Sequence, residues 1–170
     1  MRLLLVYLLF FLVQCFSACS DSSGHREKKS QHIDTIESIN STSNIVKVID
    51  GDTYDILIDK VQTRIRMEGI DAPERGMDFY KKSKEYLGQL CIGQQIKLVG
   101  EKKDQYGRLI AKSYLPDGRE LGEEMVKADM AWHFKKYSND MTLNDLEIEV
   151  RNQRIGLWSI PNPEPPWEHR

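Results

Sequence analysis

Residues 45–58 read IVKVIDGDTYDILI, and this stretch decides the fold. Apolar side chains recur at every second position on both sides of an acidic turn, at Val46 and Val48 before it and at Tyr54, Ile56 and Ile58 after it. Alternation with a period of two is typical of a half-buried strand. Asp and Gly are common where a hairpin turns. The stretch therefore predicts a β-hairpin that turns at Asp50-Gly51-Asp52.

Further strands and helices are expected on the C-terminal side of this hairpin. A third strand from Val61 to Ile70 places Arg64, Arg66 and Glu68 on one face and apolar side chains on the other. Two later apolar stretches, Gln95 to Val99 and Leu109 to Leu115, complete five strands.

Apolar residues at helical spacing predict three helices, which run from Phe79 to Leu90, from Leu121 to Ala128 and from Leu143 to Val150. The last begins with a capping-box pattern at Thr142-Leu143-Asn144-Asp145 and ends before Gly156, a candidate C-cap. The pattern favours a β-barrel plus helices (α+β), namely a five-stranded Greek-key barrel of the OB-fold type with three helices. Periodicity alone leaves an α+β sandwich open.

Three short segments carry the residues suited to chemistry. They are Asp50-Gly51-Asp52-Thr53, then Arg66 leading into Asp71-Ala72-Pro73-Glu74, and Asp104-Gln105-Tyr106-Gly107-Arg108. Metal-assisted phosphodiester cleavage requires two carboxylates that hold a hard cation, a third carboxylate that polarises water, and two arginines that bind a phosphate. Asp50-Gly51-Asp52 taken alone is simply a hairpin turn.

In order and residue type, these segments resemble the thermonuclease family, the staphylococcal-nuclease-like enzymes that cut DNA and RNA with calcium. The resemblance runs from about Ile45 to Trp158, and exported and lipoprotein members of the bacterial branch are also similar in the tail from Gly156 to Trp167. It implies the OB fold, Ca²⁺ as cofactor, water as the attacking group, and products that end in 3′-phosphate.

The same resemblance implies a role for each matching residue. Its expected metal ligands are Asp52, Asp71 and the backbone carbonyl of Ala72, with Asp50 tuning the site from outside the ligand set. The expected catalytic residues are Arg66 and Arg108, which grip the scissile phosphate, and Glu74, which acts as general base. Tyr106 matches a position that hydrogen-bonds a terminal phosphate of the substrate.

Two departures from the family pattern bear on substrate preference. Gln105 stands where the staphylococcal enzyme has lysine, and the loop after Glu74 is shorter and lacks that enzyme's basic residues. His133 is read as a structural or peripheral residue, and Cys91, between Leu90 and Ile92, as a small buried hydrophobe.

The N-terminal part of the chain predicts export. Residues 1–18 have one positive charge followed by an apolar run too short for a stable membrane span, which is typical of a signal peptide. Cys19 follows Phe16-Ser17-Ala18, a sequence similar to a bacterial lipidation box, so we expect an acylated N-terminus on the cell envelope. Ordinary cleavage and secretion is the alternative. Residues 19–43 then form a polar, flexible tether, in which His25 and His32 are read as solvated.

The remaining boundaries are a thermonuclease-like domain at residues 44–160 and a proline-rich tail at 161–170. Four of the chain's six prolines lie in this tail, so we expect it to be extended, without a helix, and packed on its own domain through Trp158 and Trp167. A polyproline ligand for another protein is the alternative reading.

The net charge of the chain limits how it can bind nucleic acid. The net charge is −2, and it becomes −3 without the first 18 residues, which contain Arg2 and no acid. General charge attraction is therefore excluded, and binding has to be local. We expect a monomeric enzyme acting on DNA and RNA, with a membrane anchor and no protein partner. A noncatalytic OB module that binds nucleic acid and a structural envelope lipoprotein are the alternatives.

Overall fold

A computed structural model describes residues 39–169. The first elements in chain order are the strands β1 (Ile39–Val48), β2 (Thr53–Ile58), β3 (Val61–Met67) and β4 (Ile70–Asp71), followed by helix α1 (Tyr80–Cys91). Next come β5 (Gln95–Lys103), β6 (Leu109–Tyr114), α2 (Leu121–Lys127), β7 (Trp132–His133) and α3 (Met141–Gln153). The chain ends with a short 3-10 helix, η1 (Gly156–Ser159), and α4 (Pro166–His169). The expected signal peptide, Cys19, His25 and His32 lie outside the described residues.

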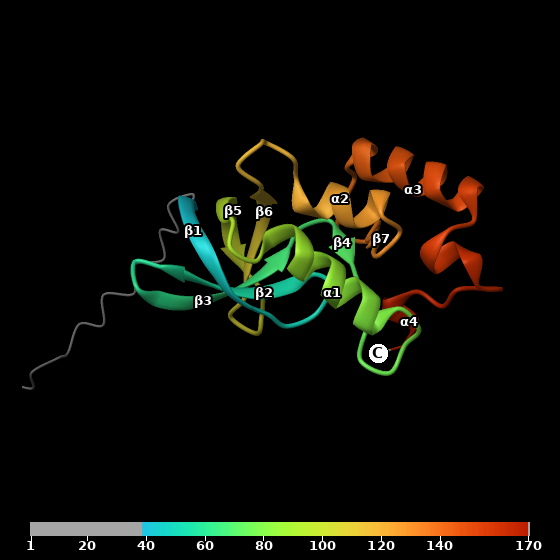
Figure 1. The fold of residues 1–170 in the computed structure, drawn as a ribbon, viewed down its shortest axis with the longest axis horizontal. Helices are drawn as coiled ribbons and strands as arrows, with labels where there is room; N and C mark the ends of the chain where they lie inside the picture. The colour runs from blue at the N-terminus through green and yellow to red at the C-terminus, as the bar shows by residue number, and fades with distance from the viewer. Residues whose placement is uncertain (1–38, 170) are drawn as a thin grey trace, which may run out of the picture. The chain divides into compact units, whose positions relative to one another are not determined.

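Five strands close into a barrel in the order β1-β2-β3-β6-β5. All neighbouring strands are antiparallel except β3 and β6, which pair in parallel with Ile65 opposite Leu109. This mixed, closed arrangement confirms the predicted OB-like barrel with helices. In Figure 1 the barrel strands lie together, α1 runs across them, and α2 and α3 lie beside them.

Most of the alternating apolar residues fill the barrel as the hairpin pattern predicted, but Val46 was wrongly placed. It is 53% exposed and Ile45 is buried, because the pairing of β1 with β2 shifts register between Ile45 and Lys47. Tyr54 and Ile56 of β2, Ile65 of β3 and Leu98 of β5 are fully buried, and Leu87 and Cys91 of α1 pack against them. Burial of Cys91 raises the pKa of its thiol to about 12, so it behaves as the small core residue expected.

The third strand is shorter than predicted. It leaves the barrel at Met67, and Gly69, at φ 79°, turns the chain. Ile70 and Asp71 then form β4, which pairs with β7 in a separate two-stranded sheet. The prediction that Ile70 belongs to the barrel was wrong, because alternation does not register a glycine that turns the strand.

The first strand starts earlier than the expected domain boundary at residue 44. Ile39–Asn44 pair with Gln95–Gly100 of β5, so part of the expected tether is strand. This segment is polar, and backbone pairing to β5 forms the strand without apolar alternation.

The helix ends also differ from the prediction. Asp140, and not Thr142, caps α3, because its side chain accepts hydrogen bonds from the backbone N–H groups of Thr142 and Leu143. Arg154, at φ 52°, ends that helix, while Gly156 opens η1.

The tail contains a fourth helix that its prolines argued against. Proline is tolerated in the first turn of a helix, where its missing N–H needs no partner, and Pro166 occupies that position in α4. Trp167 of α4 stacks on Phe134, with ring centroids 5.2 Å apart and planes 7° apart. None of the helices between residues 39 and 169 has the length and apolar character needed to cross a membrane.

Candidate active site

The acidic turn between β1 and β2 is held against α1 by close packing. Gly51 has no side chain, and a Cβ built there would lie 1.8 Å from the Ser83 hydroxyl of α1 and 2.8 Å from the Ala72 Cβ. The turn carrying Asp50 and Asp52 therefore contacts both α1 and the segment after β4.

Asp52 is buried at the start of β2 and joins these segments by hydrogen bonds. Its Oδ1 accepts from the Thr53 hydroxyl at 2.8 Å, and its Oδ2 accepts from the Ala72 backbone N–H at 2.7 Å. The residues expected to share a metal, Asp52 and Ala72, are thus in direct contact although they are far apart in sequence.

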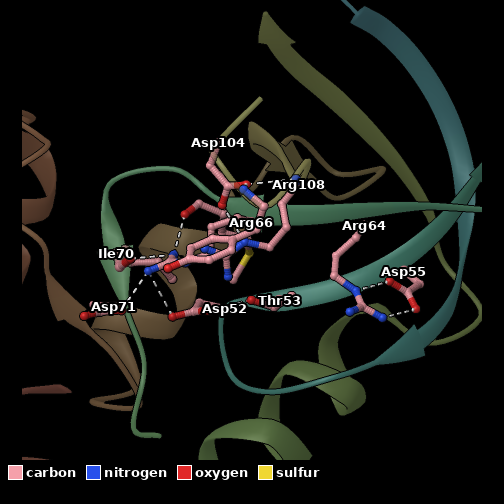
Figure 2. Close-up of polar contacts among 11 residues, drawn as sticks. Asp52, Thr53, Asp55, Arg64, Arg66, Ile70, Asp71, Asp104 and Arg108 are labelled. Carbon is pink, nitrogen blue, oxygen red and sulfur yellow. Dashed lines mark hydrogen bonds and ion pairs between the residues drawn. The ribbon is translucent and has the colours of Figure 1, made fainter. Parts of the chain in front are cut away.

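Arg66 lies at the centre of the site. It is held in β3 between Thr53 of β2 and Ile110 of β6, and only 9% of it is exposed. Its Nη2 donates to Asp71 Oδ1 at 2.7 Å and lies 3.3 Å from Asp52 Oδ2 (Figure 2). Its Nη1 donates to the carbonyl oxygens of Met67 and Ile70, both at 2.7 Å. These contacts fix the plane of the guanidinium on a rigid part of the barrel.

The two carboxylates that meet at Arg66 have the chemistry of a hard-cation site. Asp52 and Asp71 face a common point, the Nη2 atom, and both are buried. Ca²⁺ accepts carboxylates, backbone carbonyls and water, so two carboxylates and the Ala72 carbonyl are a suitable donor set. No group of three or more His, Cys, Asp or Glu side chains that could hold a metal ion is found between residues 39 and 169.

Asp50 stands next to this pair. Its Oδ1 accepts from the backbone N–H of Asp52 at 3.3 Å. Burial, together with the Asp52 carboxylate, raises the pKa of Asp50 to about 7. Ionisation of Asp50 beside Asp52 is therefore unfavourable by itself, and a nearby cation would favour it.

Arg108 is fixed by the turn between β5 and β6. Its Nε donates to Asp104 Oδ2 at 2.6 Å, and its backbone N–H donates to Asp104 Oδ1 at 2.9 Å. Burial opposes ionisation of Asp104, but the hydrogen bonds from Arg108 outweigh it and lower the pKa of that carboxyl. The Arg108 guanidinium lies 5.5 Å from the ring centre of Tyr106, which is 75% exposed. Figure 2 shows Arg66 and Arg108 near each other, while Arg64 points away to Asp55.

Glu74 follows Ala72 and Pro73 in a short turn. The Met77 backbone N–H donates to the Glu74 carbonyl oxygen at 3.0 Å, and the Glu74 backbone N–H donates to Met77 Sδ at 3.2 Å. The side chain is half-buried. Glu74 is thereby placed just beyond the acidic pair on the same segment of chain.

A cleft of about 1090 Å³ connects the two arginines with a surface that the sequence reading missed. Arg66, Arg108 and Tyr106 line one part of it together with neighbouring residues of the barrel such as Glu68 and Lys102. Another part is lined by His133 of β7, by the residues that follow it, and by side chains of α3 and α4. His133 belongs to this lining but is 97% covered, with its Nε2 at 3.1 Å from the Ser138 hydroxyl, and burial lowers its pKa. The run Lys135-Lys136-Tyr137, basic residues beside an aromatic one, is the signal that could have revealed the surface.

In comparisons with known proteins, one family model and three relatives that match this chain are all described as nucleases or endonucleases. A family model described as "Staphylococcal nuclease homologue" matches residues 64–160. An "Uncharacterized endonuclease" of Escherichia coli O157:H7 is 37% identical over 123 residues, which cover 72% of this chain and 80% of that protein. A "Micrococcal nuclease" of Shigella flexneri is 35% identical over 136 residues, with 74% and 78% covered. An "Uncharacterized endonuclease" of Haemophilus influenzae is 33% identical over 170 residues, with 99% and 85% covered.

Proposed function

The chain belongs to the staphylococcal nuclease homologue family, and from this premise we propose that it is a calcium-dependent nuclease. It hydrolyses phosphodiester bonds of DNA and RNA with little base specificity and leaves 3′-phosphate ends. The observation that carries the proposal is the meeting of Asp52 and Asp71 at a buried Arg66, in a barrel that also presents Arg108 to the same cleft. The resemblance of the N-terminal segment to a lipoprotein signal supports export and anchoring through Cys19.

Asp52, Asp71 and the Ala72 carbonyl would hold the calcium ion. Bound there, Ca²⁺ supplies a Lewis acid that offsets phosphate charge and makes a bound water easier to deprotonate. Asp50 adds negative charge beside the ligands without joining them. Magnesium is a poor substitute, because it demands stricter octahedral geometry than two carboxylates and a carbonyl on a loop provide.

Arg66 and Arg108 bind the scissile phosphate. A guanidinium presents paired N–H donors that match two phosphate oxygens, and negative charge grows on those oxygens as the fifth bond to phosphorus forms. Both arginines are already oriented, Arg66 by Asp71 and two carbonyls, and Arg108 by Asp104. Both Nη atoms of Arg66 are engaged by these carbonyl oxygens and by Asp71 and Asp52, so a phosphate would be bound by its Nε–H and by the Nη2 hydrogens that the carboxylates release when they hold calcium.

Glu74 takes the proton from the attacking water. A glutamate side chain can act as general base for a water molecule within hydrogen-bond reach. Pro73 restricts the backbone immediately before it, which helps to aim the side chain. Water attacks phosphorus, the bond to the 5′-oxygen breaks, and the phosphate stays on the 3′ side.

The test is cleavage of DNA and RNA by the purified domain, with calcium, magnesium or chelator. Arg66→Lys, Arg108→Ala and Glu74→Gln should each lower kcat by about 10²- to 10³-fold while the protein stays folded. Arg64→Ala is the matched control, since Arg64 lies on the same strand, is half-exposed and pairs with Asp55. It should cut at close to the parental rate.

Metal dependence needs its own variants. Asp52→Ala and Asp71→Ala each remove one hard oxygen ligand, so the calcium concentration for half-maximal activity should rise. Full activity in excess chelator would contradict the calcium assignment. A folded parent that binds an oligonucleotide but never cuts it would replace the nuclease with the noncatalytic binding module.

A further inference from the structure

The cleft is positively charged although the chain is acidic. Its lining has six cationic side chains, namely Arg66, Lys102, Arg108, Lys135, Lys136 and Arg151, against the three carboxylates of Glu68, Asp104 and Glu147. Even with the buried Asp52 and Asp71 that pair with Arg66 included, the cations are in excess. The whole chain carries a net charge of −2. Attraction for a polyanion is therefore concentrated in one place, and it extends well beyond the two arginines proposed for catalysis.

An aromatic wall stands in the same cleft, and we define it as Phe134, Tyr137 and Trp167. Trp167 lies parallel to Phe134, and Tyr137 meets Phe134 edge-on at 4.9 Å between ring centres. Trp167 is 38% exposed and Tyr137 is 71% exposed. Exposed rings beside cations are the arrangement with which proteins bind unpaired bases, since every base offers a flat face for stacking.

Two of the cations are held in place by a buried acid. Glu147 of α3 is 1% exposed, and its Oε2 lies 2.7 Å from Lys135 Nζ and 3.4 Å from Arg151 Nη2. The Arg151 guanidinium also lies 4.0 Å from the ring centre of Trp158. One carboxylate shared by two cations leaves a net positive charge, and about half of each cationic side chain is exposed. Lys135 and Arg151 are thus fixed next to the aromatic wall, and their remaining positive charge can attract a phosphate.

We propose that this wall, with Lys135 and Arg151, is a second nucleotide subsite that binds an unpaired nucleotide next to the one whose phosphate is cut. The inference rests on the proposed function and adds a binding surface for a neighbouring unpaired nucleotide, in which Trp167 supplies the stacking face. In a duplex the base faces are already stacked on one another and are closed to Trp167. The cleft volume of about 1090 Å³ exceeds the usual range of roughly 300–1000 Å³ for a site that holds one small ligand, which suits more than one nucleotide.

Helix α4 carries one ring that faces the subsite and one that does not. Trp167 faces the cleft, while His169 of the same short helix borders a different hollow with Gly76 and Asp78. Trp167 and His169 can therefore be replaced one at a time. A change at Trp167 removes the proposed stacking surface, whereas a change at His169 tests the effect of disturbing the helix alone.

The test uses Trp167→Ala, Trp167→Phe and the control His169→Ala on three substrates with calcium. These are a single-stranded 12-mer, its duplex, and a nitrophenyl phosphodiester of one thymidine, which has no neighbouring nucleotide. Trp167→Ala should raise KM for the single strand by at least about fivefold, the lower end of a base–aromatic stacking contribution, with kcat within about twofold. Values for the duplex and the nitrophenyl ester should not change. Trp167→Phe should recover most of the loss, and His169→Ala should match the parent.

Two kinetic results would overturn the subsite. An unchanged KM for the single strand overturns it, and so does an equal loss on all three substrates, which would show that Trp167 acts only through the fold. If the parent cuts none of the substrates, the proposed function fails, and anisotropy of a labelled 12-mer in chelator then decides the subsite. Weaker binding by the alanine variant than by the phenylalanine variant supports it, and equal binding refutes it.

Discussion

Replacing Gly51 with alanine should damage the active site through packing alone. Gly51 does not have a positive φ, so alanine is tolerated by the backbone there. The added Cβ would, however, lie 1.8 Å from Ser83 Oγ, 3.0 Å from Ser83 Cβ and 2.8 Å from Ala72 Cβ. Comfortable contacts between carbon atoms are about 3.5–4.0 Å, so the acidic turn and α1 must separate by on the order of 1 Å.

This displacement sets the expected size of the effect. Overpacking of a buried contact costs about 1–3 kcal/mol of unfolding free energy. A shift of about 1 Å in a catalytic group costs roughly 10²-fold in rate. Because Asp52 and Ala72 are the groups displaced, kcat at fixed calcium should fall by about that factor. Urea unfolding measures the first effect, and initial rates on single-stranded DNA measure the second.

Two further variants separate the steric cause from a general loss of stability. Gly88→Ala introduces the same methyl group into α1 where the nearest side-chain atom is 3.4 Å away, and it should keep the parental rate. Adding Ser83→Ala to Gly51→Ala removes the worst clash and should recover part of the rate. A Gly51→Ala protein with parental stability and parental kcat would refute the close packing of the turn on α1.

Three other predictions concern separate parts of the chain. Asp140→Ala should cost about 1 kcal/mol in urea unfolding, because it removes the cap of α3, whereas Thr142→Ala should cost almost nothing; equal costs would contradict the cap. Burial raises the pKa of Asp129 to about 6, so the folded state keeps a proton that the unfolded state releases, and stability should fall as pH rises from about 4 to 6. Asp129→Asn should remove this decrease in stability. If the free energies of unfolding of variant and parent differ by the same amount at every pH, the raised pKa of Asp129 is contradicted. Cys19→Ala should move the protein from the membrane fraction to the soluble fraction with unchanged specific activity, and equal retention would exclude lipid anchoring.

The barrel was predictable because its strands are half-buried. Alternation of apolar and polar residues indicates which face meets the core, and this holds for β5 and β6, whereas the first four residues of β2 are all buried. The sequence could not indicate the two-stranded sheet of β4 and β7, in which Ile70 pairs with His133, since strands of two residues are too short to show a period. The start of β1 was missed for a related reason, because residues 40–44 are polar and are held by backbone pairing to β5.

The tail shows how a composition rule fails in a particular context. Prolines exclude the interior of a helix but not its first position, and Pro166 is at that position. The sequence also offered no sign that Trp167 would meet Phe134, because these residues belong to different elements. A contact of this kind depends on where α3 and η1 carry the chain after residue 141, which local pattern does not determine.

The sequence could suggest the residues of the candidate site but not how Arg66 connects them. Matching residues to motifs gives each one a separate role, with Asp52 and Asp71 for metal and Arg66 for phosphate. In the structure the three are a single charged unit, because two buried carboxylates without a nearby cation would be costly, and the Arg66 guanidinium at 2.7 and 3.3 Å supplies that cation. Arg66 is in turn oriented by Asp71 for the phosphate it is proposed to bind. Removal of Arg66 therefore leaves two uncompensated carboxylates, whereas removal of either carboxylate leaves a neutral ion pair, so that the effects of single variants at this site will not add.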